Sequence, residues 1–114
     1  MSVSPRIGVV IPVYNGADDL RQTLKAFRAL PTHVLTQLEV VVADGASTDD
    51  TLNVMSTFMD VIRHADSRDD QGVYDAMNRG ADLVQAPYVW FLGAGDLPLA
   101  EGLFPLLERL EGDV

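Results

Sequence analysis

The sequence predicts an α/β fold, a three-layer α/β/α sandwich around a mostly parallel, Rossmann-like sheet. Apolar runs rich in β-branched residues alternate with amphipathic segments of helical length, and the main runs end abruptly in polar, turn-forming residues. Such alternation favours parallel strands joined by right-handed helical crossovers. In an open parallel sheet, ligands bind outside the carboxyl ends of the strands. We therefore expect the functional site at the ends of these apolar runs.

The first strand and the first helix are the clearest elements. Residues 7–13 are almost uninterrupted by polar groups, which is the pattern of a strand buried on both faces. Residues 18–30 carry apolar side chains at helical spacing, at Leu20, Leu24, Phe27 and Leu30. Pro31 ends this helix, because a proline ring cannot continue the helical hydrogen bonding.

A second strand and helix follow in the same order. Residues 38–43 form an apolar, β-branched run, and Ser47 or Thr48 can cap the helix that comes after it. The inward face of that helix is expected to carry its large apolar side chains, Leu52, Met55, Phe58 and Met59. A polar segment thus separates the end of the second strand from the helix.

The second half of the chain continues the alternation. We expect a short strand, a polar loop, a helix and a fourth strand, at residues 61–64, 66–72, 73–84 and 88–92. Trp90 and Phe91 should be buried in the fourth strand, and residues 99–110 form a last helix. Four strands make a small sheet, so we expect residues 1–114 to form one domain whose sheet is truncated.

Composition limits the classes of function. The chain carries 17 acidic and 8 basic residues, a net charge of -9, which argues against a nucleic-acid partner because that partner needs a basic face. No cysteine is present, so neither a disulfide framework nor a thiol nucleophile is expected. The apolar runs are far shorter than the roughly 20 residues that span a bilayer, and no secretion leader is visible. A cytoplasmic protein is expected.

Two aspartates follow strand ends and are candidate ligand-binding residues. Asp44 closes the second strand, where its carboxylate can accept hydrogen bonds from a ligand, or merely cap the next turn. Asp96 ends a Gly-Ala-Gly-Asp turn after the fourth strand. Its carboxylate suits a hard divalent cation, which takes oxygen ligands, and the alternative is an N-cap for the last helix.

Other polar residues admit two interpretations. Tyr14 could stack on a nucleobase at the end of the first strand, whereas Asn15 and Gly16 are also an ordinary turn signal. The acidic loop that contains Asp66, Asp69 and Asp70 could face a ligand or simply be solvated. Ser47, Thr48 and Asp49 are better explained as helix capping, and both histidines, His33 and His64, as structural residues.

Four strings in order resemble the family 2 glycosyltransferases, which have the nucleotide-sugar-binding GT-A fold. They are Val10-Ile11-Pro12-Val13-Tyr14-Asn15, Asp44-Gly45-Ala46-Ser47-Thr48-Asp49-Asp50-Thr51, Asp70-Gln71-Gly72-Val73-Tyr74-Asp75-Ala76-Met77-Asn78-Arg79-Gly80 and Trp90-Phe91-Leu92-Gly93-Ala94-Gly95-Asp96. Each string is weak alone, and their order and spacing make the resemblance specific. It covers residues 7 to about 106 and implies that the chain is the N-terminal, donor-binding half of such an enzyme.

The resemblance implies roles for particular residues. The nucleotide would be bound by Pro12, Tyr14, Asp44, Asp70 and Gly72. Asp44 would read the edge of the base, usually uracil, and Asp96 would hold Mg²⁺ or Mn²⁺ against the diphosphate. The sequence departs from the common pattern at Gly95, where a second aspartate is frequent, and at Gly45, which replaces a second acid after the second strand.

The family's reaction transfers a sugar from a nucleotide-diphosphate sugar to an acceptor hydroxyl with inversion. The implied partners are a UDP-sugar donor and a saccharide or lipid-linked acceptor, in cell-surface polysaccharide biosynthesis at the inner membrane face, and a homo-oligomer is possible. No residue before Val114 matches the family's general base. The alternative is an inactive nucleotide-binding or assembly module of the same fold.

Overall fold

The computed structural model describes residues 5–98 and contains eight helices and strands within that range. In chain order they are β1 (Ile7–Val13), α1 (Ala17–Arg28), α2 (Thr32–Leu35), β2 (Leu38–Asp44), α3 (Thr51–Thr57), β3 (Ile62–Ser67), α4 (Val73–Leu83) and β4 (Tyr88–Phe91). The expected strand–helix alternation is confirmed. The short helix α2 was not expected, and the predicted helix over 99–110 lies outside the described residues.

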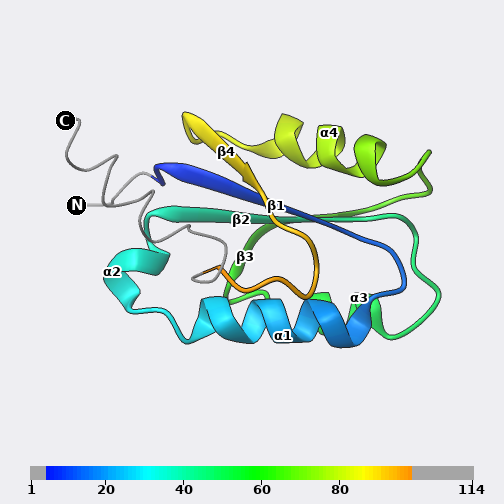
Figure 1. Cartoon of the computed structure of the whole chain (residues 1–114), viewed down its shortest axis with the longest axis horizontal. Helices are drawn as coiled ribbons and strands as arrows, with labels where there is room; N and C mark the ends of the chain where they lie inside the picture. The colour runs from blue at the N-terminus through cyan, green and yellow to red at the C-terminus, as the bar shows by residue number, and fades with distance from the viewer. Residues whose placement is uncertain (1–4, 99–114) are drawn as a thin grey trace.

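The four described strands form one parallel sheet in the order β3-β2-β1-β4. Strands β1 and β2 pair along their whole length, so Val13 and Asp44 lie opposite each other at the carboxyl end. Figure 1 shows α4 on one side of the sheet and α1, α2 and α3 on the other. The expected three-layer α/β/α arrangement is therefore confirmed.

The larger core lies between the sheet and the layer of α1 and α3. Alternate residues of β1 and β2 point into it and meet the buried face of α1, including Leu20, Leu24 and Phe27. Period-two alternation along the strands places the other side chains on the α4 side. The central strands are buried on both faces, as the sequence predicts.

Helix α4 packs very closely on β1, because glycine stands at two contact points. A Cβ atom at Gly8 would collide with the side chain of Val84, and one at Gly80 would collide with Val10. Absence of a side chain at these positions lets the helix and strand backbones approach. This contact fixes where the N-terminus of α4 lies relative to the end of β1.

The expected inward face of the third helical segment is wrong in part. Leu52 and Met59 are 43% and 50% exposed, whereas Val54 is buried together with Met55 and Phe58. The helix α3 ends at Thr57, so helical periodicity does not extend to the last of these residues. Met59 lies beyond the end of α3, and Leu52 lies within α3 on its exposed side.

The expectation of a buried fourth strand is also wrong in part. Phe91 is 44% exposed and Trp90 is only half-buried, although Leu92 just after the strand is buried. Strand β4 is an edge strand of the described sheet, so it has a neighbour on one side only. Among residues 5–98, no helix is both long and apolar enough to cross a membrane.

Candidate functional site

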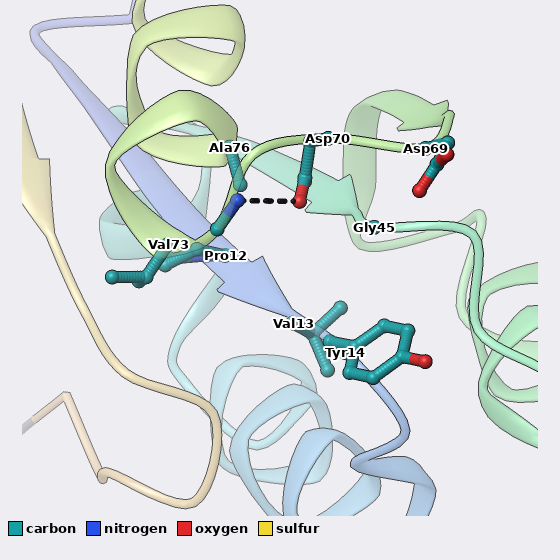
Figure 2. A pocket seen from close by; sticks show the side chains of 9 residues that line it. Pro12, Val13, Tyr14, Gly45, Asp69, Asp70, Val73 and Ala76 are labelled. Atoms are coloured by element: carbon teal, nitrogen blue, oxygen red, sulfur yellow. Dashed lines mark hydrogen bonds between the residues drawn. The ribbon is translucent and has the colours of Figure 1, made fainter.

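A cavity of about 460 Å³ opens at the carboxyl ends of β1 and β2, beside the N-terminus of α4. It is lined by residues of both strand ends, the loop before α4 and the first turns of α4: Pro12, Val13, Tyr14, Gly45, Asp69, Asp70, Gly72, Val73 and Ala76. Figure 2 shows these residues around the end of β1. The location is the one that an open parallel sheet favours for a ligand.

Strand β1 contributes the apolar part of the cavity. Pro12 and Val13 are largely buried residues of the strand, and Tyr14 follows them with 65% of its surface exposed. Figure 2 shows the Tyr14 ring beside the end of β1. An exposed aromatic ring at the mouth of a cavity presents a flat face on which a planar ligand group can stack.

Asn15 joins the loop after β1 to the loop after β2. Its backbone has a positive φ of 49°, and its Oδ1 accepts hydrogen bonds from the amides of Thr48 at 2.8 Å and Asp49 at 3.3 Å. Its own amide donates to Ser47 Oγ at 2.7 Å. Asparagine tolerates this left-handed conformation better than most residues. The predicted turn is confirmed, and it also links two loops at the site.

Asp44 is fully buried at the end of β2 and lies outside the cavity lining. Its carboxylate accepts hydrogen bonds from the amide and hydroxyl of Ser47 and, at 2.8 Å, from the hydroxyl of Ser67. The carboxylate thus caps the following turn, the alternative that the sequence left open, and ties it to β3. Ser47 consequently organises the strand end and does not cap α3, which the sequence analysis expected.

Asp49 precedes the N-cap residue of α3 and holds the first residue of that helix. Asp49 Oδ1 accepts hydrogen bonds from the amide and hydroxyl of Thr51, and its Oδ2 accepts one from the amide of Ala17 at 3.3 Å. The hydrogen bond to the Thr51 hydroxyl is the main cause that lowers the pKa of Asp49 below its ordinary value. The N-cap residue of α3 is Asp50, whose side chain makes no cap hydrogen bond, so the expectation that Ser47, Thr48 or Asp49 caps the helix is wrong in its position.

Asp70 faces the cavity and is held by a buried arginine. Its Oδ1 accepts a hydrogen bond from the Gly72 amide at 3.1 Å, drawn as the dashed line in Figure 2, and its Oδ2 accepts one from Arg79 at 2.7 Å. The same guanidinium also pairs with Asp66 and donates to the Asp44 carbonyl oxygen at 3.3 Å. Arg79 therefore joins α4, β2, β3 and the acidic loop.

Electrostatics keep this cluster charged. Burial by itself would raise the pKa of Asp66, but hydrogen bonding and charge from Arg68 and Arg79 outweigh it and hold that pKa below its ordinary range. Burial would likewise lower the pKa of Arg79, and its bonds and charge interactions with Asp70 and Asp66 raise it instead. Asp66 and the Arg79 guanidinium are thus ionised at neutral pH.

Gly72 stands directly before α4 with a φ of 115°, a conformation that side-chain-bearing residues rarely adopt. No neighbouring atom lies within 4 Å of the place where its Cβ would be, so the backbone faces open space at the cavity. The first amides of a helix have no partner within the helix. Gly72 leaves this end of α4 accessible to a ligand.

Asp96 lies in the turn after β4, apart from the cavity lining. Its amide donates to the Gly93 carbonyl oxygen, and its own carbonyl oxygen accepts a hydrogen bond from buried Thr23 at 2.8 Å. The Thr23 hydroxyl also accepts a hydrogen bond from the Gly95 amide at 2.8 Å. Helix α1 thereby holds the turn that carries the predicted metal ligand.

The donor set near Asp96 is compatible with a divalent cation only if a ligand completes it. The Asp96 carboxylate accepts no hydrogen bond from residues 5–98, so within that range its oxygens are available. No group of three or more acidic, histidine or cysteine side chains within the described part of the chain could hold a metal ion. One carboxylate suffices when diphosphate oxygens supply other ligands.

The structure brings together part of the predicted site. The cavity lining includes Pro12, Tyr14, Asp70 and Gly72, and it excludes Asp44 and Asp96. Arg79 received no role in the sequence analysis. The available signal was an arginine about two helical turns beyond the acidic loop, in a chain with only 8 basic residues.

Comparison with known proteins agrees with these observations. Residues 8–114 match the family described as Glycosyl transferase family 2. The chain is 39% identical over 98 residues to the PGL/p-HBAD biosynthesis glycosyltransferase of Mycobacterium tuberculosis, covering 82% of this chain and 36% of that relative. The chain thus spans about a third of the length of this relative.

Solved structures show the same fold. S. aureus TarS 1-349 in complex with UDP-GlcNAc superposes with a TM-score of 0.72 at 20% identity, over 91% of this chain and 31% of TarS. The mannosyltransferase PcManGT from Pyrobaculum calidifontis, in complex with GDP-Man and Mn²⁺, superposes with a TM-score of 0.69 at 27% identity, over 83% of this chain and 29% of that chain. The cavity at the strand ends and the fold shared with these structures agree with the family match. The chain therefore belongs to glycosyl transferase family 2.

Proposed function

We propose that this chain binds the nucleotide-diphosphate sugar donor of a glycosyltransferase, with UDP as the preferred nucleotide. The observation that carries the proposal is the cavity at the ends of β1 and β2, which combines an exposed aromatic ring at Tyr14 with a hydrogen-bond acceptor at Asp70. The ring suits a planar base, and the carboxylate suits the N–H or ribose O–H groups of a nucleoside. TarS, of the same fold, holds UDP-GlcNAc.

The charges of the lining residues place the nucleoside and the phosphates at opposite ends of the cavity in this proposal. Asp69 and Asp70 would repel the diphosphate, so the uncharged nucleoside lies on their side and the phosphates lie away from them. Tyr14 stacks against the base. Asp44 acts through the loop that it holds, because its oxygens already accept three hydrogen bonds inside the protein.

Asp96 would hold a divalent cation, Mg²⁺ or Mn²⁺, against the diphosphate. Such a cation neutralises the charge that develops on the leaving diphosphate during transfer. Support comes from the free carboxylate oxygens of Asp96 within the described residues and from PcManGT, which is in complex with Mn²⁺. The role of Thr23 is to keep the turn in place through two hydrogen bonds, at its hydroxyl.

The complete reaction is proposed for the longer protein of which this chain represents the donor-binding part. Sugar transfer to a hydroxyl of a saccharide or lipid-linked acceptor, with inversion, needs a base that removes the acceptor proton. The cavity acids Asp69 and Asp70 face the donor nucleotide in this proposal, so neither serves as that base.

A binding module without catalysis is the second candidate, and Gly95 favours it. Its φ of 99° disfavours the second aspartate that is frequent in the family, and an added Cβ would lie 3.3 Å from the Asp19 carboxyl carbon. Restoring that aspartate would therefore strain the turn and set two carboxylates side by side. A protein that binds UDP without metal would fit this candidate.

Calorimetric titration of UDP separates these proposals. The protein is titrated with Mn²⁺ present, then with excess EDTA, and the titrations are repeated on Asp70→Ala and Asp96→Ala. The donor-site proposal expects UDP affinity to fall at least tenfold in Asp70→Ala, with or without metal. It also expects Mn²⁺ to strengthen UDP binding by the parent protein and to have no effect on UDP binding by Asp96→Ala. A folded protein that binds neither UDP nor GDP would contradict it.

A further inference from the structure

The side chain of Arg79 connects the cavity to the sheet beneath it. It is 12% exposed and reaches from α4 to the carboxylates of Asp66 and Asp70 and to the carbonyl oxygen of Asp44. Burying a guanidinium is costly unless charged partners and hydrogen bonds compensate for lost water. An arginine placed at such cost, directly behind a cavity wall, calls for a role beyond helix packing.

Asp70 has one orientation because three groups restrict it. Arg79 binds Oδ2 at 2.7 Å and the Gly72 amide binds Oδ1 at 3.1 Å. A Cβ at Gly45 would lie 3.0 Å from Oδ2, so the carboxylate rests directly against the backbone that ends β2. Each carboxylate oxygen can accept a second hydrogen bond. Asp70 is thus a fixed acceptor with capacity left for a ligand in the cavity that it lines.

Arg79 also decides which part of a ligand can approach Asp70. A carboxylate without a counter-ion would repel an anionic nucleotide as a whole, whereas the guanidinium behind Asp70 offsets its charge. Asp69, which also lines the cavity, has no ion pair with an arginine, lysine or histidine of residues 5–98. The phosphates are still disfavoured on this side, and neutral N–H and O–H donors are favoured.

We propose that Arg79 is a positioning residue that holds Asp70 as a fixed hydrogen-bond acceptor for the neutral nucleoside part of the donor. The proposal rests on the function proposed above and adds a residue that does not line the cavity itself. Removal of Arg79 frees the Asp70 side chain to rotate and leaves its charge without compensation. The free rotation weakens recognition of the nucleoside, and the uncompensated charge adds repulsion of the phosphates, so uridine reports the loss of positioning without the phosphate effect.

The test measures binding of uridine and of UDP to the protein and to Arg79→Met, Arg79→Lys, Asp70→Asn and the double variant Arg79→Met/Asp70→Asn. Uridine affinity should fall about tenfold or more in Arg79→Met and recover in part in Arg79→Lys, which restores the charge but not the fork of donors. The double variant should bind no more weakly than Asp70→Asn alone, because Arg79 acts through Asp70.

Arg28→Met is the matched control for loss of an arginine–aspartate pair. Arg28 binds Asp60 with two hydrogen bonds of 2.6 and 3.0 Å, and neither residue lines the cavity. Its removal should leave uridine affinity within about twofold of the parent protein. Equal affinity in Arg79→Met and Arg28→Met would show that Arg79 is merely structural and would overturn the proposal.

A measurement without ligand separates this inference from the function on which it rests. The Gly72 amide donates to Asp70 Oδ1, so its NMR proton resonance reports the orientation of that carboxylate. It should shift upfield in Arg79→Met and stay in place in Arg28→Met. An unchanged Gly72 resonance would overturn the positioning role even if uridine binds. Failure of the parent protein to bind uridine or UDP would instead contradict the donor site.

Discussion

Strand β2 carries a buried acid at each end, and the two acids have different tasks. Glu39, near the amino end, is 2% exposed and accepts hydrogen bonds from the amides of Gln85 and Ala86 and from His64. Asp44, at the carboxyl end, is fully buried and binds Ser47 and a residue of β3. One acid fastens the connection between α4 and β4, and the other shapes the loop beside the cavity.

The difference shows that burial and bonding alone do not identify a functional acid. Both carboxylates are satisfied by protein donors, as buried polar groups must be. Only the position in the sheet separates them, because ligands bind at carboxyl ends in this architecture. Mutations at Glu39 should therefore change stability alone, whereas mutations at Asp44 should change stability and ligand binding together.

Glu39→Ala should give the largest loss of stability. It leaves the amides of Gln85 and Ala86 without their acceptor, at a cost of about 3 kcal/mol in the free energy of unfolding. Glu39→Gln is the matched control, because its amide oxygen can still accept from both amides. Urea denaturation measures the loss, and UDP affinity of the folded fraction should stay unchanged. A parallel loss of affinity would break the distinction between the two acids.

Asp44→Ala should cost less stability and should lower affinity. Two of its three donors are the hydroxyl groups of Ser47 and Ser67, which can turn to other acceptors. We therefore expect the free energy of unfolding to fall by about 2 kcal/mol. The loop after β2 loses its anchor, and UDP binding should weaken about tenfold. Calorimetry on Asp44→Ala and Asp44→Asn gives the comparison. Unchanged affinity in a folded Asp44→Ala variant would remove Asp44 from the site.

Thr23→Val extends the comparison to the turn that carries Asp96. The fully buried hydroxyl of Thr23 bonds the Gly95 amide and the Asp96 carbonyl oxygen, so its loss should cost about 1.5 kcal/mol. Thr23→Ser keeps the hydroxyl and serves as the control. The Mn²⁺ concentration needed for half-maximal UDP binding should rise in Thr23→Val and not in Thr23→Ser. An identical Mn²⁺ dependence in both variants would contradict a role for this turn in holding metal.

Acid titration of Asp66 gives the smallest effect. Its pKa in the folded protein lies below the ordinary value, so the folded state binds the proton more weakly than the unfolded state. The stabilisation is present above about pH 4 and is lost as the pH falls through the lowered pKa. The stability difference between the parent protein and Asp66→Asn should therefore be constant near neutral pH and shrink below about pH 4. Urea denaturation at a series of pH values measures this difference. A difference that grows in acid would contradict a lowered pKa of Asp66.

Much of the fold could be predicted because the signals are local. The apolar run of β1 and the spacing of α1 lie within single segments, and both elements appear almost where the pattern places them. Exposure of Phe91 could not be predicted in this way, since it depends on the neighbours that the sheet order gives to β4. Burial of a strand is a property of the whole sheet.

The candidate site was predicted by position and less well by contact. Strand-end reasoning selected Tyr14, the acidic loop added Asp70, and the family resemblance added Pro12, and all three line the cavity. Ser67, which donates a hydrogen bond to the Asp44 carboxylate, lies 23 residues further along the chain. Arg79 is likewise 35 residues from the Asp44 carbonyl oxygen that it contacts. Pairings of such distant residues leave no pattern in a single sequence.

The close contact of α4 with β1 has a consequence for how the cavity exchanges its ligand. Pro12 and Val13 form one wall and Val73 and Ala76 form another, and the glycine contacts at Gly8 and Gly80 join their two elements without intervening side chains. These walls belong to one cooperative unit, so the hydrogen-bonded amide protons in the interior of β1 and α4 should exchange with solvent only through opening of the whole sheet. Entry and exit of a ligand must then use the loop edge of the cavity, on a timescale independent of that opening.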